Sequence, residues 1–167
     1  MKLPESRALS WIGLAIRLLA AGIWLFAGAV KVADLQSFQV EVSRYQLLPQ
    51  LLVAPFSYVL PFVELGVGVY LAIGLLVRGA ALAGTLLFAL FLAAQAWAMA
   101  KGLAIDCGCF GPAVESTVSP LTVIRDFCLG IPTFFMLPFP ARFFSLDRRL
   151  FGAPNMFGEP APAGPRD

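Results

Sequence analysis

Two cysteines separated by one residue, Cys107 and Cys109, are the side chains of this sequence best placed to do chemistry together. They lie in the segment Asp106–Gly111, which reads DCGCFG. Gly108 lacks the Cβ that would crowd two sulfurs held so close. A disulfide across this spacing closes a very small ring and departs from relaxed geometry, and strained, exposed disulfides tend to be exchange-competent. The pair therefore indicates thiol–disulfide exchange, with a structural disulfide that stiffens the loop as the alternative.

Metal binding is the weaker interpretation of these thiols. The chain has no His, and Cys128 is its only other cysteine, so one chain lacks the four ligands of a closed zinc site. We therefore expect no metal. Within the pair, the Asp106 carboxylate beside Cys107 disfavours a thiolate there, which makes Cys109 the expected attacking group.

The composition places these cysteines in a membrane protein. The 167 residues are 59% hydrophobic and 13% charged, with a mean hydropathy of +0.83, whereas soluble domains carry about 25% charged residues. A helix needs about 20 apolar residues to cross a bilayer. Four segments meet this need, so we predict an all-α membrane protein, a four-helix transmembrane antiparallel bundle. The predicted spans are residues 11–30, 53–77, 80–99 and 121–139.

The elements between the spans follow from local signals. An apolar stripe at helical spacing predicts a short amphipathic helix in the first external loop, lying on the membrane surface and ended by Pro49. The dipeptide Arg78-Gly79 predicts a tight connection between the second and third spans. Ser119 and Pro120 predict the N-cap and first residue of the fourth helix. The stripe consists of Leu35, Phe38, Val42 and Tyr45.

The two ends of the chain have separate interpretations. Residues 142–167 are basic at first and then rich in Pro, Ala and Gly. This composition predicts a disordered cytoplasmic tail and leaves residues 1–141 as one membrane domain. At the other end, Ala27-Gly28-Ala29 resembles a cleavage site, so a signal peptide is the alternative to the first span. The apolar stretch is long for a signal peptide and contains Arg17, which favours the span.

The basic residues that flank the spans predict the orientation. Lys and Arg concentrate on the cytoplasmic side of multi-pass proteins. With both termini inside, the cytoplasmic side carries six basic residues and the external side three. We therefore expect a bacterial-type cytoplasmic (inner) membrane, cytoplasmic termini and an external cysteine segment, where disulfides persist. The six are Lys2, Arg7, Arg78, Arg142, Arg148 and Arg149, and the three are Lys31, Arg44 and Lys101.

Four polar residues inside the predicted spans form a second candidate site. Glu64 and Gln95 fall near the middle or in the outer half of the membrane. Arg125 and Asp126 start about 8–9 Å below the outer end of the fourth span, at about 1.5 Å per residue. An ionisable group at such depth usually pairs, faces a cavity or does chemistry. We therefore predict an ion pair between Glu64 and Arg125 that clamps the second and fourth spans together.

Several motifs resemble one family of membrane proteins. Residues 26–34 (FAGAVKVAD) and 45–49 (YQLLP) resemble the start of the DoxX/MauE group, and residues 61–66 (PFVELG) and 71–75 (LAIGL) continue that resemblance. The cysteine segment followed by Arg125-Asp126 resembles the signature of the MauE branch. The resemblance implies a four-helix, redox-associated membrane protein. In the family's methylamine setting it further implies a link to maturation of a disulfide-rich dehydrogenase subunit, alongside a thioredoxin-like partner.

Two hypotheses of function follow. In the first, the chain is a thiol–disulfide relay or maturation factor for an exported disulfide-containing protein, and hence an oxidoreductase. In the second, it is a non-enzymatic scaffold or chaperone with a structural Cys-X-Cys loop; a transporter using Glu64 ranks third. No motif indicates a cofactor, and none argues for a quinone between the helices. The expected partners are the lipid bilayer and a thioredoxin-like or client protein, not nucleic acid. Cys128 is expected to be a small buried packing residue.

Overall fold

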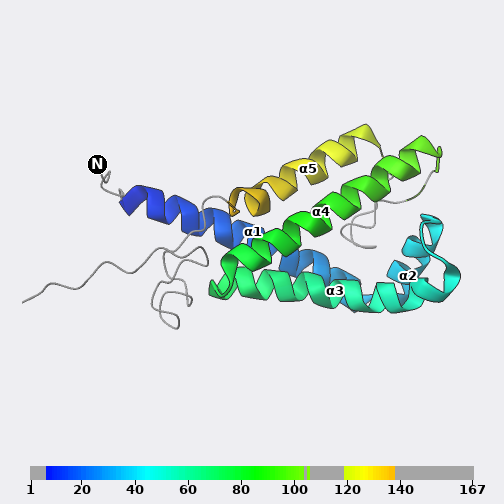
Figure 1. The fold of residues 1–167 in the computed structure, drawn as a ribbon, viewed down its shortest axis with the longest axis horizontal. Coiled ribbons are helices and arrows are strands. Elements are labelled where there is room, and N and C mark those ends of the chain that lie inside the picture. Colours follow the sequence, from blue (N-terminus) through cyan, green and yellow to red (C-terminus); the bar gives the residue numbers. More distant parts are fainter. Residues whose placement is uncertain (1–6, 104, 106–118, 138–167) are drawn as a thin grey trace, which may run out of the picture.

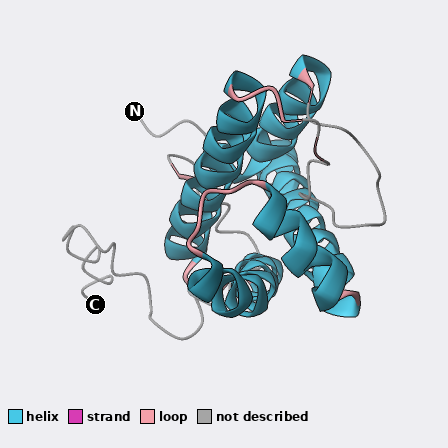
Figure 2. Ribbon diagram, turned by 90° about the vertical axis from the view of Figure 1, so that its right-hand side faces the viewer, coloured by secondary structure: helices cyan, strands magenta, loops and turns pink. Residues whose placement is uncertain are grey.

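The computed structural model describes residues 7–103, 105 and 119–137, and within these ranges the chain is helical with no strand. Five helices follow one another in the order shown in Figure 1. Every connection between them that the structure describes is short, and Figure 2 shows the helices side by side with loops at their ends. The helices are α1 (Arg7–Ala33), α2 (Leu35–Arg44), α3 (Gln50–Ile73), α4 (Val77–Ala100) and α5 (Pro120–Phe135).

Three of these helices are long and apolar enough to cross a membrane: Trp11–Ala33 in α1, Gln50–Ile73 in α3 and Val77–Ala100 in α4. They confirm the predicted multi-pass membrane protein, with ends within about four residues of the predicted ones at most boundaries, as expected for pattern-based limits. The fourth predicted span coincides with α5, which has 16 residues. At about 1.5 Å per residue, α5 is about 24 Å long, shorter than the other three.

The turn between α3 and α4 lies four residues earlier than predicted. Gly74 ends α3 in the left-handed conformation with φ of 71°, and its N–H donates to the carbonyl of Tyr70. Leu76 is also left-handed, with φ of 49°, and α4 begins directly after it. Arg78 therefore sits in the first turn of α4, and the predicted Arg78-Gly79 connection is wrong. Gly74 takes this role because a glycine adopts positive φ without steric cost.

Helix α2 confirms the predicted short helix between the first two spans. Asp34 caps it, accepting a 3.0 Å hydrogen bond from the Ser37 N–H, and the Ser37 hydrogen bonds hold the pKa of this carboxyl below its ordinary value. Of the predicted stripe, Phe38 is buried. Pro49 does not end α2, which stops at Arg44; it is the N-cap of α3. The helix packs mainly on α3.

Helices α1 and α3 make the most extensive contact between any two described helices, and glycines allow their approach. A Cβ on Gly28 would lie 2.8 Å from Leu65 Cγ and 2.9 Å from the carbonyl oxygen of Pro61. A Cβ on Gly68 would lie 2.9 Å from the backbone nitrogen of Leu25. Since backbone atoms cannot move aside as side chains do, these two positions fix how near the two helices come. Small residues have this function in many membrane helix pairs.

Helix α5 completes the packing against α4 and α1. The Trp24 indole N–H donates a 3.1 Å hydrogen bond to Thr133 Oγ1, joining α1 to α5. The Trp24 ring meets Phe88 of α4 edge to face at 4.7 Å. Gly84 of α4 lies in the same cluster, where a Cβ would come 2.8 Å from Thr133 Cγ2. As predicted, Ser119 caps α5 and Pro120 is its first residue.

The glycine contact gives a testable consequence for stability. Gly28→Ala should lower the free energy of unfolding by about 1–3 kcal/mol, the usual cost of overpacking, because its Cβ meets the α3 backbone. Gly22→Ala is the matched control on the same helix, since a Cβ there meets nothing within 4 Å. That variant should be neutral or slightly stabilising. Unfolding of the purified protein in mixed micelles measures both, and equal effects would contradict the close contact.

Candidate functional site

A buried ion pair joins the last turn of α1 to the middle of α3. Lys31 Nζ lies 2.8 Å from Glu64 Oε1 and 2.9 Å from Oε2, so the ammonium donates to both carboxylate oxygens. Both side chains are 0% exposed. Hydrogen bonds between ionised groups are shorter and stronger than neutral ones. The arrangement satisfies each charge with the other in a place that water does not reach.

Aromatic rings from two further helices enclose the lysine. Lys31 Nζ is 5.5 Å from the ring centroid of Phe38 on α2 and 5.3 Å from that of Phe91 on α4. Both distances fall within the range over which a cation is attracted by a ring face, about 6 Å. The ion pair thus brings α1, α2, α3 and α4 together at one point.

The local sequence explains why Lys31 reaches this position. Gly28 precedes Lys31 by three residues, so both lie on one face of α1, the face that touches the α3 backbone. Glu64 follows the start of α3 by 14 residues, which is about 21 Å along the helix axis. Lys31 is only two residues from the end of α1. Helix α3 therefore extends well beyond the end of α1, and α2 packs beside this extension.

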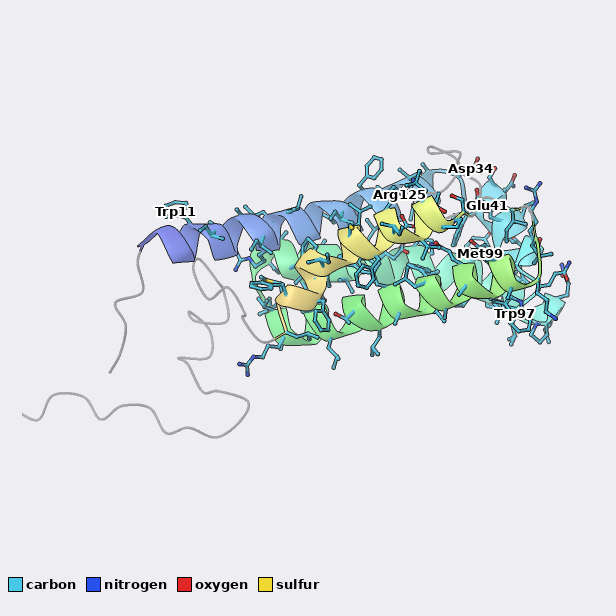
Figure 3. All side chains as sticks on the ribbon, turned by 90° about the horizontal axis from the view of Figure 1, so that it is seen from above. Trp11, Asp34, Glu41, Trp97, Met99 and Arg125 are labelled. Atoms are coloured by element: carbon cyan, nitrogen blue, oxygen red, sulfur yellow. The ribbon has the colours of Figure 1, made fainter. Side chains whose placement is uncertain are left out.

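A second polar cluster lies between α4 and α5. Gln95 Nε2 donates a 2.8 Å hydrogen bond to Asp126 Oδ2, and Arg125 Nε lies 2.9 Å from Asp126 Oδ1. Gln95 and Asp126 are buried, whereas the Arg125 side chain is 34% exposed. Figure 3 shows Arg125 toward the same end of the molecule as Asp34 and Glu41, with Trp11 at the opposite end.

The structure divides the four predicted polar residues between two places. Gln95, Arg125 and Asp126 are together, whereas Glu64 is in the other cluster with Lys31. The predicted Glu64–Arg125 ion pair is therefore wrong. So is the assignment of Lys31 to the external surface, because its side chain is fully buried. The sequence signal for Lys31 is its spacing of three residues from Gly28. This spacing places the lysine on the same face of α1 as a glycine that allows close contact with another helix.

The predicted exchanging cysteines, Cys107 and Cys109, lie outside the described residues. The described chain stops at Ile105, which is buried, and resumes at Ser119. Cys128 is described, and it is a free thiol exposed on the outer side of α5. The expectation that Cys128 is buried by packing is therefore wrong. Within the described ranges, no three potential metal-binding side chains of His, Cys, Asp or Glu come together.

Fold and site define the class of this protein: a multi-pass helical membrane protein with charged side chains paired inside its helix cluster. The family model described as "Methylamine utilisation protein MauE" matches residues 9–138. The chain belongs to the MauE family, and the MauE resemblance of its motifs is thereby confirmed.

Individual relatives agree with this assignment. The methylamine utilization protein MauE of Paracoccus denitrificans is 34% identical over 116 residues, which cover 69% of this chain and 62% of that protein. The protein of the same name from Methylorubrum extorquens is 39% identical over 115 residues, covering 67% of this chain and 62% of that one. The match thus spans less than two thirds of these relatives' length. No solved structure matches the chain.

A double-mutant cycle tests the ion pair. Lys31→Met and Glu64→Gln should each be strongly destabilising, by about 3–5 kcal/mol on the scale of soluble proteins, because each leaves a buried polar partner unmatched. The double variant should be less destabilised than the sum of the two, by about 0.5–3 kcal/mol. Unfolding free energies of the four proteins in mixed micelles provide the measurement.

The matched control for this cycle pairs Glu64→Gln with Arg125→Gln. These two residues belong to separate clusters, so their effects should add to within about 0.3–0.5 kcal/mol. Additivity in the Lys31 cycle, together with coupling in the Arg125 cycle, would show that Glu64 pairs with Arg125 after all.

Proposed function

We propose that this chain is a membrane-embedded thiol–disulfide relay that acts in the maturation of an exported disulfide-containing protein. The observation that carries the proposal is the Cys-X-Cys motif, Cys107 and Cys109, in the segment joining α4 to α5 of a MauE family member. The related proteins are named for methylamine utilisation, so a subunit of methylamine dehydrogenase type is the proposed client. A thioredoxin-like protein is the proposed redox partner.

The chemistry of the relay is a two-electron exchange between a dithiol and a disulfide. In one direction, a thiolate of a reduced partner attacks the Cys107–Cys109 disulfide and forms a mixed disulfide. The second thiol of the partner then attacks the mixed disulfide and releases both cysteines of the pair as thiols. The partner forms one disulfide and gives up two protons and two electrons. The Cys107–Cys109 pair takes up these protons and electrons and becomes a dithiol. The reverse sequence would reduce the partner.

The framework around the cysteine segment supports such a role. The Gln95–Asp126 hydrogen bond ties the last turns of α4 to the first turns of α5. At the start of α5, Ser119 and Thr122 form a capping box, with each side chain accepting from the other residue's backbone N–H. The two ends from which the segment departs are therefore held in fixed positions. A relay needs such a fixed base, because its thiols must be presented to a separate protein.

We further propose α5 as a fourth span, which makes the fold a four-helix antiparallel bundle in the bacterial cytoplasmic membrane. The outward side chains of α5 are almost all large and apolar, as contact with lipid requires. Helix α2 would then lie at the external boundary of the bilayer. The exposed apolar residues on α5 are Leu121, Ile124, Phe127, Ile131, Phe134 and Phe135.

The charge distribution supports cytoplasmic termini and an external cysteine segment. Because Lys31 is buried in its ion pair, it no longer counts among the external basic residues. Arg44 and Lys101 remain there, so the ratio of cytoplasmic to external basic residues is six to two instead of six to three. This strengthens the orientation expected from the positive-inside rule.

Replacing both cysteines separates the relay from a scaffold. Cys107→Ser with Cys109→Ser should abolish oxidation or reduction of the client while leaving the unfolding midpoint of the membrane domain unchanged. A scaffold would instead keep its effect on the client and lose some stability. The measurement is the redox state of the client and of the pair, by alkylation and mass shift, with and without added reductant.

Cys128→Ser is the matched control for the same assay. Its thiol is exposed on α5 and belongs to neither polar cluster, so this variant should behave like the wild type. Full client maturation by the variant lacking Cys107 and Cys109 would reject the relay. Loss of maturation in the Cys128 variant would move the exchanging role to that residue.

Reporter fusions test the proposed topology. Fusions at Leu47 and near Ser116 should show external activity, and a fusion after Arg149 should show cytoplasmic activity. The expectation rests on an odd number of crossings before Leu47 and an even number before Arg149. A cytoplasmic reporter near Ser116 would contradict both the topology and the relay, because cytoplasmic thiols are kept reduced.

A further inference from the structure

An apolar cavity of about 150 Å³ lies between α2, α3 and α4, and no described residue of α1 or α5 lines it. Its wall comes from α2 and the segment after it, from the first half of α3 and from the second half of α4. Glu41 is the one charged residue of the wall. The other lining residues are Phe38, Val42, Tyr45, Leu47, Leu48, Phe56, Leu60, Leu90, Phe91 and Ala94.

The size of the cavity corresponds to one six-membered ring. An engineered apolar cavity of about 150 Å³ in a soluble protein stays free of water and binds benzene. Ligand sites of full drug-like molecules are larger, about 300–1,000 Å³. The cavity described here therefore accommodates the ring of a ligand, and any attached chain must lie outside it.

The wall favours a flat aromatic or quinonoid ring over an aliphatic chain. Four aromatic side chains converge on the cavity from three elements: Phe38 and Tyr45 from α2 and its C-cap, Phe56 from α3 and Phe91 from α4. Offset and edge-to-face contacts between rings stabilise by about 0.5–1.5 kcal/mol beyond the area that they bury. An acyl chain against the same wall gains only the free energy of burying its apolar surface, without the additional contribution from ring–ring contacts.

The ion pair makes the electrostatic potential differ from one part of the cavity wall to another. The Lys31 ammonium lies over the rings of Phe38 and Phe91, at 5.5 and 5.3 Å from their centroids. Both rings line the cavity. The carboxylate of Glu64 lies on the α3 side of the lysine. The Lys31 ammonium therefore stands behind Phe38 and Phe91, whereas the Glu41 carboxylate is itself part of the wall. Carbonyl oxygens on a ring would be attracted toward the two phenylalanines and repelled by Glu41.

The rim of the cavity connects it to the surroundings of the helices. Leu47 and Leu90 line the cavity and are 44% and 48% exposed. Both are large apolar side chains, so the entrance is suited to a lipid-soluble molecule and not to a polar solute from water. A chain attached to the ring would leave between such residues into the bilayer.

We propose that this cavity binds the head group of a lipid-soluble ligand with a single carbonyl-bearing ring and an apolar tail, the class of the isoprenoid quinones. Ring-sized volume, four converging aromatic side chains, a cation behind two of them and an apolar rim together define this class. The proposal does not depend on the cysteine relay, because every residue it uses lies in the helices or directly after α2.

Equilibrium binding of radiolabelled decylubiquinone to the full-length protein in lipid nanodiscs tests the proposal. Ala94→Phe fills the cavity and should weaken binding by at least about tenfold, or about 1.4 kcal/mol. Ala93→Phe is the matched control, since Ala93 is the neighbouring residue on α4, exposed and outside the wall. It should bind within about twofold of the wild type, a difference of roughly 0.4 kcal/mol.

A second pair of variants serves if Ala94→Phe does not fold. Phe56→Leu removes a ring from the wall and should weaken quinone binding several-fold, whereas Phe62→Leu, an exposed position on the same helix, should not. Undecane, an alkyl chain without a ring, should not compete with the quinone. Equal effects of the cavity and control variants, absence of saturable binding, or full competition by undecane would each overturn the proposal.

Discussion

The ion pair between Lys31 and Glu64 is the interaction on which the rest of this structure depends. Two charges without solvent contact inside a membrane protein are stable only if each fully compensates the other, and here one ammonium donates to both carboxylate oxygens. That geometry requires the backbones of α1 and α3 to approach closely, which Gly28 permits. It also requires α1 to end near the middle of α3, which leaves the first half of α3 to be covered by α2.

The polar groups of the fold are thereby separated by function. Lys31 and Glu64 bring four helices together, and neither of their two charges is exposed to solvent. The cluster of Gln95, Arg125 and Asp126 instead joins the two helix ends that carry the cysteine segment. In the proposed relay, chemistry takes place in that segment, and the buried ion pair supports it only by keeping the helices in place. The apolar cavity lies beside the ion pair and shares Phe38 and Phe91 with it.

Local signals in the sequence predicted the helices well, whereas the positions of residues on different helices relative to one another along the bundle axis were predicted poorly. Apolar runs located the three long helices, and Ser119 with Pro120 located the start of α5. The partner of Glu64 was missed because counting each span from its own outer end assumes that the ends are level. Helix α3 instead begins far beyond the end of α1. The exposed position of Cys128 was missed for a related reason: lipid-facing and core-facing sides of a membrane helix are both apolar, so periodicity does not distinguish them.

The measurement that tests the central ion pair most directly is a nitrogen–carbon distance in a lipid bilayer. Solid-state NMR on protein labelled with ¹⁵N at lysine Nζ and ¹³C at the glutamate carboxyl carbon reports this distance through their dipolar coupling. The 2.8 and 2.9 Å contacts from Nζ to the two oxygens predict strong dephasing of one glutamate signal. That dephasing should disappear in the Lys31→Met variant. A wild-type spectrum in which no glutamate carboxyl is dephased by lysine nitrogen would contradict the account.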